Sequence, residues 1–195
     1  MHKKFILIVV FFLSACTNPF STRTPEEPAI NTKPHSINSL QNHPDSLFSK
    51  LKYAFKEKNV NYYIECLADP ARVKTVFTFM PQQNEAYRLT NWTLQDEFNY
   101  FSRLVNNKDI QKVNLQIYNV EDWTFVSNTQ DTMQSRFSYE ITLYLKTKKE
   151  YYRGQSIFKI LRSFQSLWYI YLWEDFQLNS KQVDSTWSTL KANYR

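Results

Sequence analysis

Residues 167–176 read LWYIYLWEDF, and this stretch decides the fold class because its composition is typical of a β-strand. Aromatic and aliphatic residues fill its first seven positions, and Glu174 and Asp175 follow them. Since side chains alternate between the two faces of a strand, both faces are apolar. We expect one face to pack on helices and the other to line a cavity or a partner surface. Strict alternation predicts one face made of Trp168, Ile170 and Leu172 and another made of Leu167, Tyr169, Tyr171 and Trp173.

Three earlier stretches alternate in the same way and predict a meandering sheet. Residues 113–118 and 137–145 alternate apolar with polar side chains, and residues 152–161 follow at hairpin spacing. A turn at residues 162–166 joins the third stretch to LWYIYLWEDF. Residues 73–79 read as a further extended segment.

Helices are predicted before these strands, and a short helix after them. Residues 47–55 carry apolar side chains at helical spacing. Thr93 and Asp96 can form the capping box of a second helix. Ser185 or Thr186 can open the final helix. This order predicts an α+β domain in which N-terminal helices cover one face of an antiparallel sheet. The predicted apolar face of the second helix consists of Leu94, Phe98, Phe101, Leu104 and Val105.

The order of elements, the LWYIYLWEDF strand and the W-x-x-L-K ending at residues 187–191 resemble the nuclear transport factor 2-like superfamily. The resemblance covers about residues 44–195. It implies a cone, in which a curved antiparallel sheet wraps around helices and leaves a pocket at its open end. Members of the superfamily include dehydratases, isomerases, non-catalytic binding modules and transport factors, so the fold alone does not decide the function.

Composition excludes several classes of active site. Gly154 is the only glycine, which rules out a P-loop, a dinucleotide fingerprint and a nucleophile elbow. The three histidines all precede residue 44, so the segment after them can hold neither a Ser-His-Asp triad nor a His-ligated metal. We therefore predict no metal and no cofactor.

Residues 1–16 read MHKKFILIVVFFLSAC and predict export from the cytoplasm. The apolar run at residues 5–13 suits a secretory signal and is too short to span a membrane. It ends in Leu13-Ser14-Ala15-Cys16, which resembles the lipobox of bacterial lipoproteins. That resemblance implies that residues 1–15 are removed and that acyl chains on Cys16 anchor the protein in the membrane. The alternative is an ordinary signal peptide cut near Ala15.

The rest of the chain is expected to form a tether and one domain. Residues 16–43 begin with the lipidated cysteine and contain four of the seven prolines among Ser, Thr and Asn, a composition typical of disorder. Residues 44–195 form the single predicted domain. Thr17 is not acidic, and in the lipoprotein family this implies outer-membrane rather than inner-membrane residence in the bacterial envelope. Cys66 is expected to be a small buried hydrophobe.

The candidate pocket is inferred from aromatic and acidic residues placed near the open end of the cone: Trp92, Glu97, Trp168, Tyr171, Trp173 and Asp175. A carboxylate in an aromatic pocket has a raised pKa and can act as a general base, which is a possible role for Asp175 or Glu97. The alternative for Asp175 is a cap, an ion pair or a solvated group. The tryptophans can stack on a flat ligand or pack in the core. No residue is assigned as catalytic.

Three hypotheses for function remain open. The first is a non-enzymatic lipoprotein that binds an envelope protein or a small apolar ligand. The second is an enzyme of the dehydratase or isomerase type that uses the pocket carboxylates with tyrosines. The third is a structural subunit of an envelope assembly, and a homodimer is possible. Nucleic acid is not expected as a partner of an exported protein. The lysines of the first helix are expected to be solvated, at Lys50, Lys52, Lys56 and Lys58.

Overall fold

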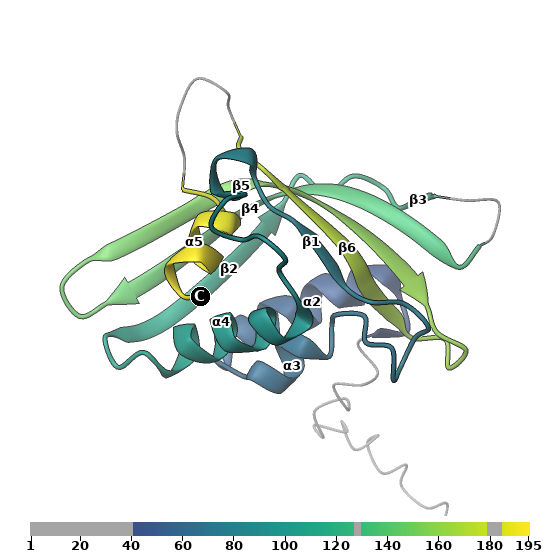
Figure 1. Ribbon diagram of the computed structural model, residues 1–195, viewed down its shortest axis with the longest axis horizontal. Helices are drawn as coiled ribbons and strands as arrows, with labels where there is room; N and C mark the ends of the chain where they lie inside the picture. Colours follow the sequence, from purple (N-terminus) through teal and green to yellow (C-terminus); the bar gives the residue numbers. More distant parts are fainter. Residues whose placement is uncertain (1–40, 127–129, 179–184) are drawn as a thin grey trace, which may run out of the picture. The chain divides into compact units, whose positions relative to one another are not determined.

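The computed structural model describes residues 41–126, 130–178 and 185–195. The predicted signal peptide, Cys16 and all but the last three residues of the predicted tether lie outside the described residues. Four α-helices and six β-strands make up the described part of the chain (Figure 1). In chain order they are α2 (Pro44–Lys56), α3 (Val60–Ile64), β1 (Thr78–Met80), α4 (Leu94–Asn106), β2 (Ile110–Tyr118), β3 (Thr124–Phe125), β4 (Thr132–Leu145), β5 (Lys149–Arg162), β6 (Trp168–Phe176) and α5 (Trp187–Asn193).

The sheet has the strand order β1-β6-β5-β4-β2, with β3 paired to β4. All pairings are antiparallel except the one between β1 and β6, which is parallel. The α+β class and the curved sheet agree with the prediction, but the sheet is mixed rather than antiparallel. The reason is that the chain after α3 runs along the free edge of β6, where Ala68 N donates to Ile170 O over 2.8 Å and Ile170 N donates to Cys66 O over 2.9 Å. β1 continues in the same direction.

A β-bulge in β6 makes the predicted alternation of this strand wrong. Lys159 pairs with Leu172 and Ile160 pairs with Ile170, so the residue between the partners on β6 has no counterpart on β5. An extra residue in one strand reverses the faces of the residues that follow it. Ile170 and Trp173 are consequently both fully buried, although strict alternation assigns them to opposite faces.

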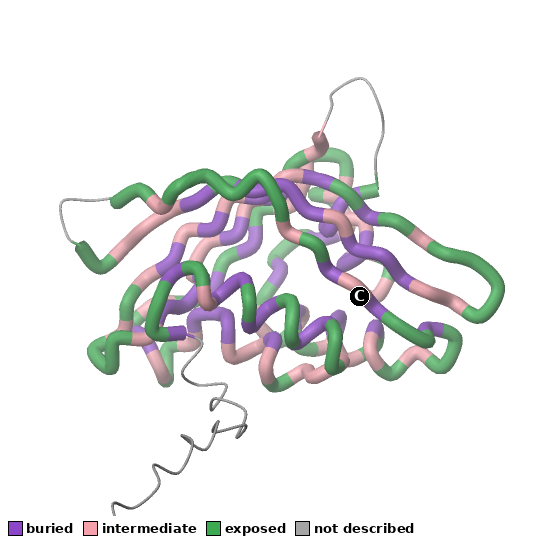
Figure 2. Tube along the Cα trace, turned by 180° about the vertical axis from the view of Figure 1, so that it is seen from behind, coloured by how far each residue is buried: buried purple, intermediate pink, exposed green. Residues whose placement is uncertain are grey.

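Buried residues line the middle of the strands and the helix faces turned toward them (Figure 2). Phe48 of α2 packs on Phe137 and Phe158, with ring centroids 5.0 and 5.8 Å apart. Tyr63 of α3 stacks on Phe101 of α4 at 4.1 Å. Aromatic pairs of this kind supply much of the burial in a chain without a disulfide among its described residues.

The capping box of α4 is confirmed, but the face that the helix buries differs from the prediction. Thr93 Oγ1 accepts from Asp96 N over 3.3 Å, and Asp96 Oδ2 accepts from Thr93 N over 2.9 Å. Phe98 is 41% exposed, whereas Glu97 and Tyr100 are fully buried. The prediction of the buried face used apolar residues alone and therefore left out Glu97. Its hydrogen-bond and ion-pair partners in the core cannot be recognised from the helix sequence.

Lys50 is also buried, although the sequence predicts a solvated side chain. Its ammonium forms an ion pair with Glu65 at 2.8 Å and donates to Gln41 Oε1 over 2.6 Å. Gln41 in turn donates to Trp168 O over 3.1 Å, which ties the beginning of the described chain to β6. Cys66 is buried, as predicted, and burial raises the pKa of its thiol to about 12.

In the parts of the chain that the structure describes, no helix is both long enough and apolar enough to cross a membrane. The same residues contain no group of three His, Cys, Asp or Glu side chains that could hold a metal ion.

Candidate functional site

The concave side of the sheet contains α5, which lies between the strands and α4 (Figure 1). Trp187, Ser188, Leu190 and Lys191 of this helix are buried. The ring of Trp187 packs edge-to-face on Trp173 at 4.4 Å and on Tyr139 at 5.1 Å. Thus α5 packs against β4 and β6 through its tryptophan.

Asp175 holds the first turn of α5. Its carboxylate accepts hydrogen bonds from Ser188 N over 2.8 Å, from Ser188 Oγ over 2.6 Å and from the Tyr139 hydroxyl over 2.6 Å. Trp187 N donates to the same tyrosine oxygen over 2.7 Å. Burial raises the pKa of Asp175, while the hydrogen bonds from Ser188 and Tyr139 act in the opposite direction. Among the roles considered for Asp175, the geometry is that of a helix cap.

Glu97 is the second buried carboxylate and forms an ion pair with Lys191 of α5. The Tyr63 hydroxyl donates to Glu97 Oε2 over 2.6 Å, and Trp92 Nε1 donates to Oε1 over 2.8 Å. Burial lowers the pKa of Lys191 to about 8, and the neighbouring Glu97 carboxylate opposes this shift. The Lys191 ammonium and the Glu97 carboxylate therefore face each other inside the domain, away from solvent.

Four of the six predicted pocket residues, Trp92, Glu97, Trp173 and Asp175, surround α5. Trp173 Nε1 donates to Ser156 Oγ over 3.1 Å, and that hydroxyl lies 3.3 Å from Asp175 Oδ1. Trp173 and Asp175 are therefore linked through the hydroxyl of Ser156 in the interior of the domain.

The other two predicted pocket residues lie elsewhere. Trp168 is at the start of β6, with the guanidinium of Arg162 over its ring at 5.9 Å. Tyr171 is at the bulge and is partly buried. Sequence reasoning also missed Lys191, Tyr139 and Tyr63. The available signal was the lysine of the W-x-x-L-K ending, which directly follows a leucine. A lysine that turns toward the core needs a carboxylate there to pair with.

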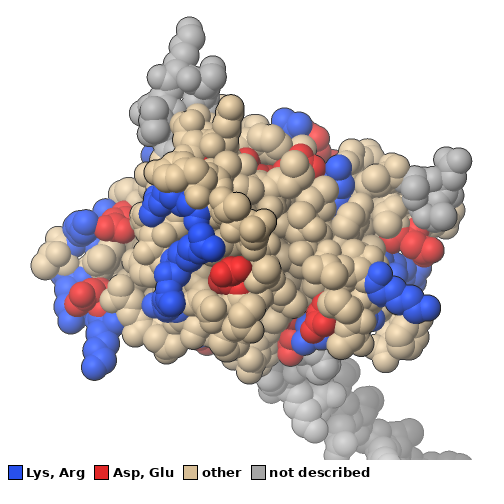
Figure 3. Space-filling model, viewed as in Figure 1, with Lys and Arg blue, Asp and Glu red and all other residues tan. Residues whose placement is uncertain are grey.

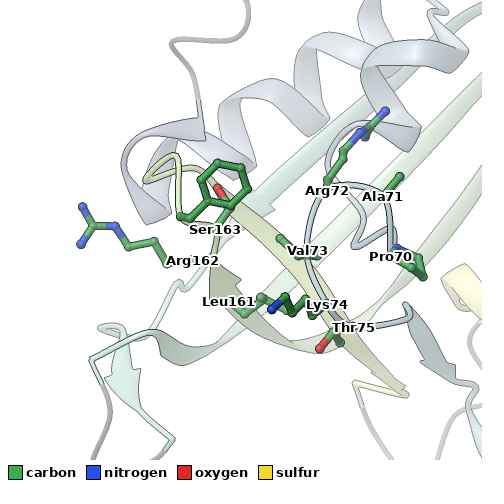
Figure 4. Close-up of a pocket in the computed structure, with 10 residues that line it drawn as sticks. Pro70, Ala71, Arg72, Val73, Lys74, Thr75, Leu161, Arg162 and Ser163 are labelled. Atoms are coloured by element: carbon green, nitrogen blue, oxygen red, sulfur yellow. The ribbon is translucent and has the colours of Figure 1, made fainter.

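An open groove of about 420 Å³ lies on the surface, between the turn at residues 70–75 and the end of β5 (Figure 4). Its lining includes the apolar side chains of Leu161 and Val73 and the basic side chains of Lys74 and Arg162. Phe164, in the turn that joins β5 to β6, also borders it and is 90% exposed.

Basic side chains gather over α5 on the face shown in Figure 3. Arg88 donates to Glu85 and to Asn193, each over 2.9 Å. The guanidinium of Arg195 lies over the ring of Trp92 at 5.9 Å. These contacts hold the C-terminal residues against the segment that precedes α4.

Solved structures with a similar fold were found by comparison. The beta subunit of the benzoate 1,2-dioxygenase from Burkholderia mallei superposes with a TM-score of 0.52 at 18% identity, over 72% of this chain and 91% of that chain. A provisionally assigned dehydratase of the nuclear transport factor 2-like family from Streptomyces avermitilis gives 0.51 at 10% identity, over 69% and 93%. A nuclear transport factor 2-like superfamily protein from Salmonella enterica serovar Typhimurium gives 0.51 at 10% identity, over 74% and 95%.

No protein-family model matches the sequence, and no curated protein matches it. At these identities the superpositions concern the fold and not the activity. They agree with the curved mixed sheet and with the few helices packed against it. The described domain has the nuclear transport factor 2-like fold.

Proposed function

We propose that this chain is a lipoprotein of the bacterial envelope, anchored by acyl chains on Cys16, whose domain is a non-catalytic binding module. The anchor rests on the sequence of residues 1–16, with its apolar run and its lipobox. The location most consistent with Thr17 is the outer membrane. The partner is an envelope protein or a small apolar ligand.

The observation that carries the non-catalytic role is the commitment of both interior carboxylates to structural bonds. Glu97 pairs with Lys191, and Asp175 caps α5. A general base has to come within hydrogen-bond distance of a substrate proton. With α5 in place, Glu97 is fully buried. Asp175 is 2% exposed, at the edge of an open hollow of about 550 Å³ that Gln82 and Phe176 also line, and its oxygens are engaged by Ser188 and Tyr139. The surface groove beside Phe164 is the better place for a partner.

An enzymatic role has one observation in its favour. Burial raises the pKa of Asp175, and the Tyr139 hydroxyl lies 2.6 Å from it, which is the pair of groups that a dehydratase or isomerase of this fold would need. This role requires α5 to leave the interior. It predicts that a ligand which binds in the interior displaces α5 and so makes the residues of α5 accessible to proteases. If the domain is a binding module with a closed interior, ligand binding should not increase the cleavage of α5.

The anchor is tested by metabolic labelling with a tagged fatty acid, using the Cys16→Ala chain and a matched Cys66→Ala chain. Only the first change should abolish labelling and release the protein from membranes, because Cys66 is buried in the domain. Density-gradient separation of the two membranes then tests the outer-membrane location. Unchanged membrane retention of the Cys16→Ala chain would contradict the lipoprotein assignment.

The binding role is tested by native and denaturing mass spectrometry of the chain from Thr17 onward, together with crosslinking in the envelope. Extra mass that is lost on denaturation identifies a small ligand, and a crosslinked protein identifies a partner. Phe164→Ser should weaken either interaction, whereas Tyr87→Ser, at a residue 79% exposed and outside the groove, should not. If the protein forms a homo-oligomer of defined size and shows neither a bound ligand nor a crosslinked partner, the result would favour the alternative that it is a structural subunit of an envelope assembly.

A further inference from the structure

The ammonium group of Lys191 lies inside a box of aromatic rings. It is 3.4 Å from the ring centroid of Phe79 and 3.8 Å from that of Trp173. Three further rings lie 5.9 to 6.0 Å away, those of Phe77, Trp92 and Tyr100. A cation over the face of an aromatic ring within about 6 Å is attracted by the ring quadrupole, and most strongly where water is excluded.

A carboxylate completes this arrangement and supplies the hydrogen bond that rings cannot. Glu97 and Lys191 are both fully buried, and the ammonium donates to Glu97 Oε1. Trp92 donates to the same oxygen, Oε1, and the Tyr63 hydroxyl donates to the other oxygen, Oε2. An ammonium group at this position is therefore stabilised by cation–π interactions with the rings and by one charge-assisted hydrogen bond to the carboxylate.

The five rings around the ammonium and the Glu97 carboxylate all belong to parts of the chain other than α5. Phe79 belongs to β1, Trp173 to β6, and Glu97 and Tyr100 to α4. Trp92 precedes α4 and donates to Glu97 independently of Lys191. From α5, only the ammonium of Lys191 lies inside the box, while Trp187 supports the box from outside by packing on Trp173 and donating to the Tyr100 hydroxyl. The relation of the ammonium to the box is therefore that of an occupant to its binding site.

The second buried lysine shows that this arrangement is not a general property of buried ammonium groups. Lys50 is fully buried and pairs with Glu65 at 2.8 Å. Its other hydrogen-bond partner is the amide oxygen of Gln41. Within the described residues, no aromatic ring lies over the Lys50 ammonium at cation–π distance, whereas five lie around that of Lys191.

We propose that the interior of the domain contains a binding site for a primary alkylammonium group, made of the aromatic box and Glu97, and that Lys191 occupies it within the same chain. The bond to Glu97 requires an N–H donor, which excludes a quaternary ammonium group, and the group that fills the site is the primary ammonium of Lys191. The linear alkyl stem of the lysine sets the shape of the rest of the ligand. When α5 is displaced, the same site is open to an amine from another molecule. This inference does not depend on the lipid anchor or on the partner proposed above.

The test is chemical rescue of Lys191→Ala in the full chain, purified in mild detergent. The substitution removes the atoms of a propylammonium ion, so that ion is the probe, and 1-propanol is the neutral probe of the same shape. We expect propylammonium at pH 7 to raise the melting temperature of the variant saturably by about 5 °C or more. Wild type should not respond, because its own lysine fills the site. An equal response to propanol, or a response no larger than that of wild type, would overturn the proposal.

Two further variants keep the test decisive. Lys50→Ala loses an equally buried ammonium outside the box and should gain no more from propylammonium than wild type does. Glu97→Gln/Lys191→Ala has no uncompensated carboxylate, so it should fold but fail to respond. If Lys191→Ala alone is unfolded, the readout becomes the recovery of its near-ultraviolet circular dichroism on adding propylammonium. Absence of recovery while the double variant is folded also counts against the site.

Discussion

The hydroxyl of Tyr139 occupies the space that a side chain at Gly154 would need. The two residues face each other across β4 and β5, and a Cβ on Gly154 would lie 2.3 Å from the Tyr139 hydroxyl oxygen and 2.6 Å from Phe176 O. That hydroxyl donates to Asp175 and accepts from Trp187 N. The absence of a side chain at the only glycine therefore lets a buried tyrosine join β6 to α5.

We predict that Gly154→Ala destabilises the domain by about 2–4 kcal/mol, because the tyrosine must move and both of its hydrogen bonds are lost. Urea denaturation measures the change. Tyr139→Phe is the partner for a double-mutant cycle, since it removes the same hydroxyl. The effects of the two changes should be less than additive. Full additivity would show that the hydroxyl is not the obstacle.

Asp175→Asn should lower the free energy of unfolding by about 1–3 kcal/mol. The amide keeps one acceptor oxygen where the carboxylate has two, so one of the donors from Ser188 or Tyr139 faces an amino group. Asp109→Asn is the matched control, because that carboxylate is 67% exposed and its ion pair with Lys146 is on the surface. Equal stability of the two variants would argue against the capping role of Asp175.

The buried lysine predicts a particular dependence of stability on pH. Burial lowers the folded-state pKa of Lys191 to about 8, below its value of 10.5 in the unfolded chain. Between these values the unfolded state binds more protons, so stability should rise with pH by at most about 1.4 kcal/mol per unit. Glu97→Gln/Lys191→Met should lack this rise.

The two proteins are compared by urea denaturation at pH 7, 8, 9 and 9.5. The buried tyrosines are present in both, so subtracting one curve from the other isolates the lysine. Burial raises the pKa values of Tyr63, Tyr100 and Tyr139, and this lowers stability only above about pH 10, where the unfolded tyrosines ionise. Parallel curves over this range would mean that Lys191 keeps its ordinary pKa.

Cys66 should resist alkylation in the folded protein. Its thiol is fully buried, and a pKa of about 12 against 9.0 leaves about a thousandfold less thiolate at neutral pH. In the chain from Thr17 onward it is the only cysteine, so mass spectrometry after iodoacetamide treatment reports it alone. Labelling should be slow in buffer and rapid in urea. Rapid labelling in buffer would instead indicate that α3 opens readily.

Local patterns were sufficient to predict β2, β4, β5, β6 and the capping box of α4, because alternation and caps depend on neighbours in the sequence. They did not predict β3, and the extended segment expected at residues 73–79 is a strand only from Thr78 onward. They failed where a residue depends on a distant partner. Glu97 was predicted as a pocket residue, but its ion-pair partner Lys191, 94 positions away, was not predicted. The bulge in β6 likewise follows from pairing with β5 and leaves no mark in LWYIYLWEDF. Asp175 was identified as a candidate, but its role as a cap required the position of α5.

The position of α5 in the chain has a consequence for biosynthesis. During translation, every strand and helix that α5 contacts emerges before α5 itself. Until then, Glu97 lacks its cation and Asp175 lacks the Ser188 donors. Without α5, Glu97 keeps its hydrogen bonds from Tyr63 and Trp92 but has no cation, and Asp175 keeps only those from Tyr139 and Ser156. Carboxylates in an aromatic interior without these partners oppose closure of the core, so the domain should be less stable without α5 than with it.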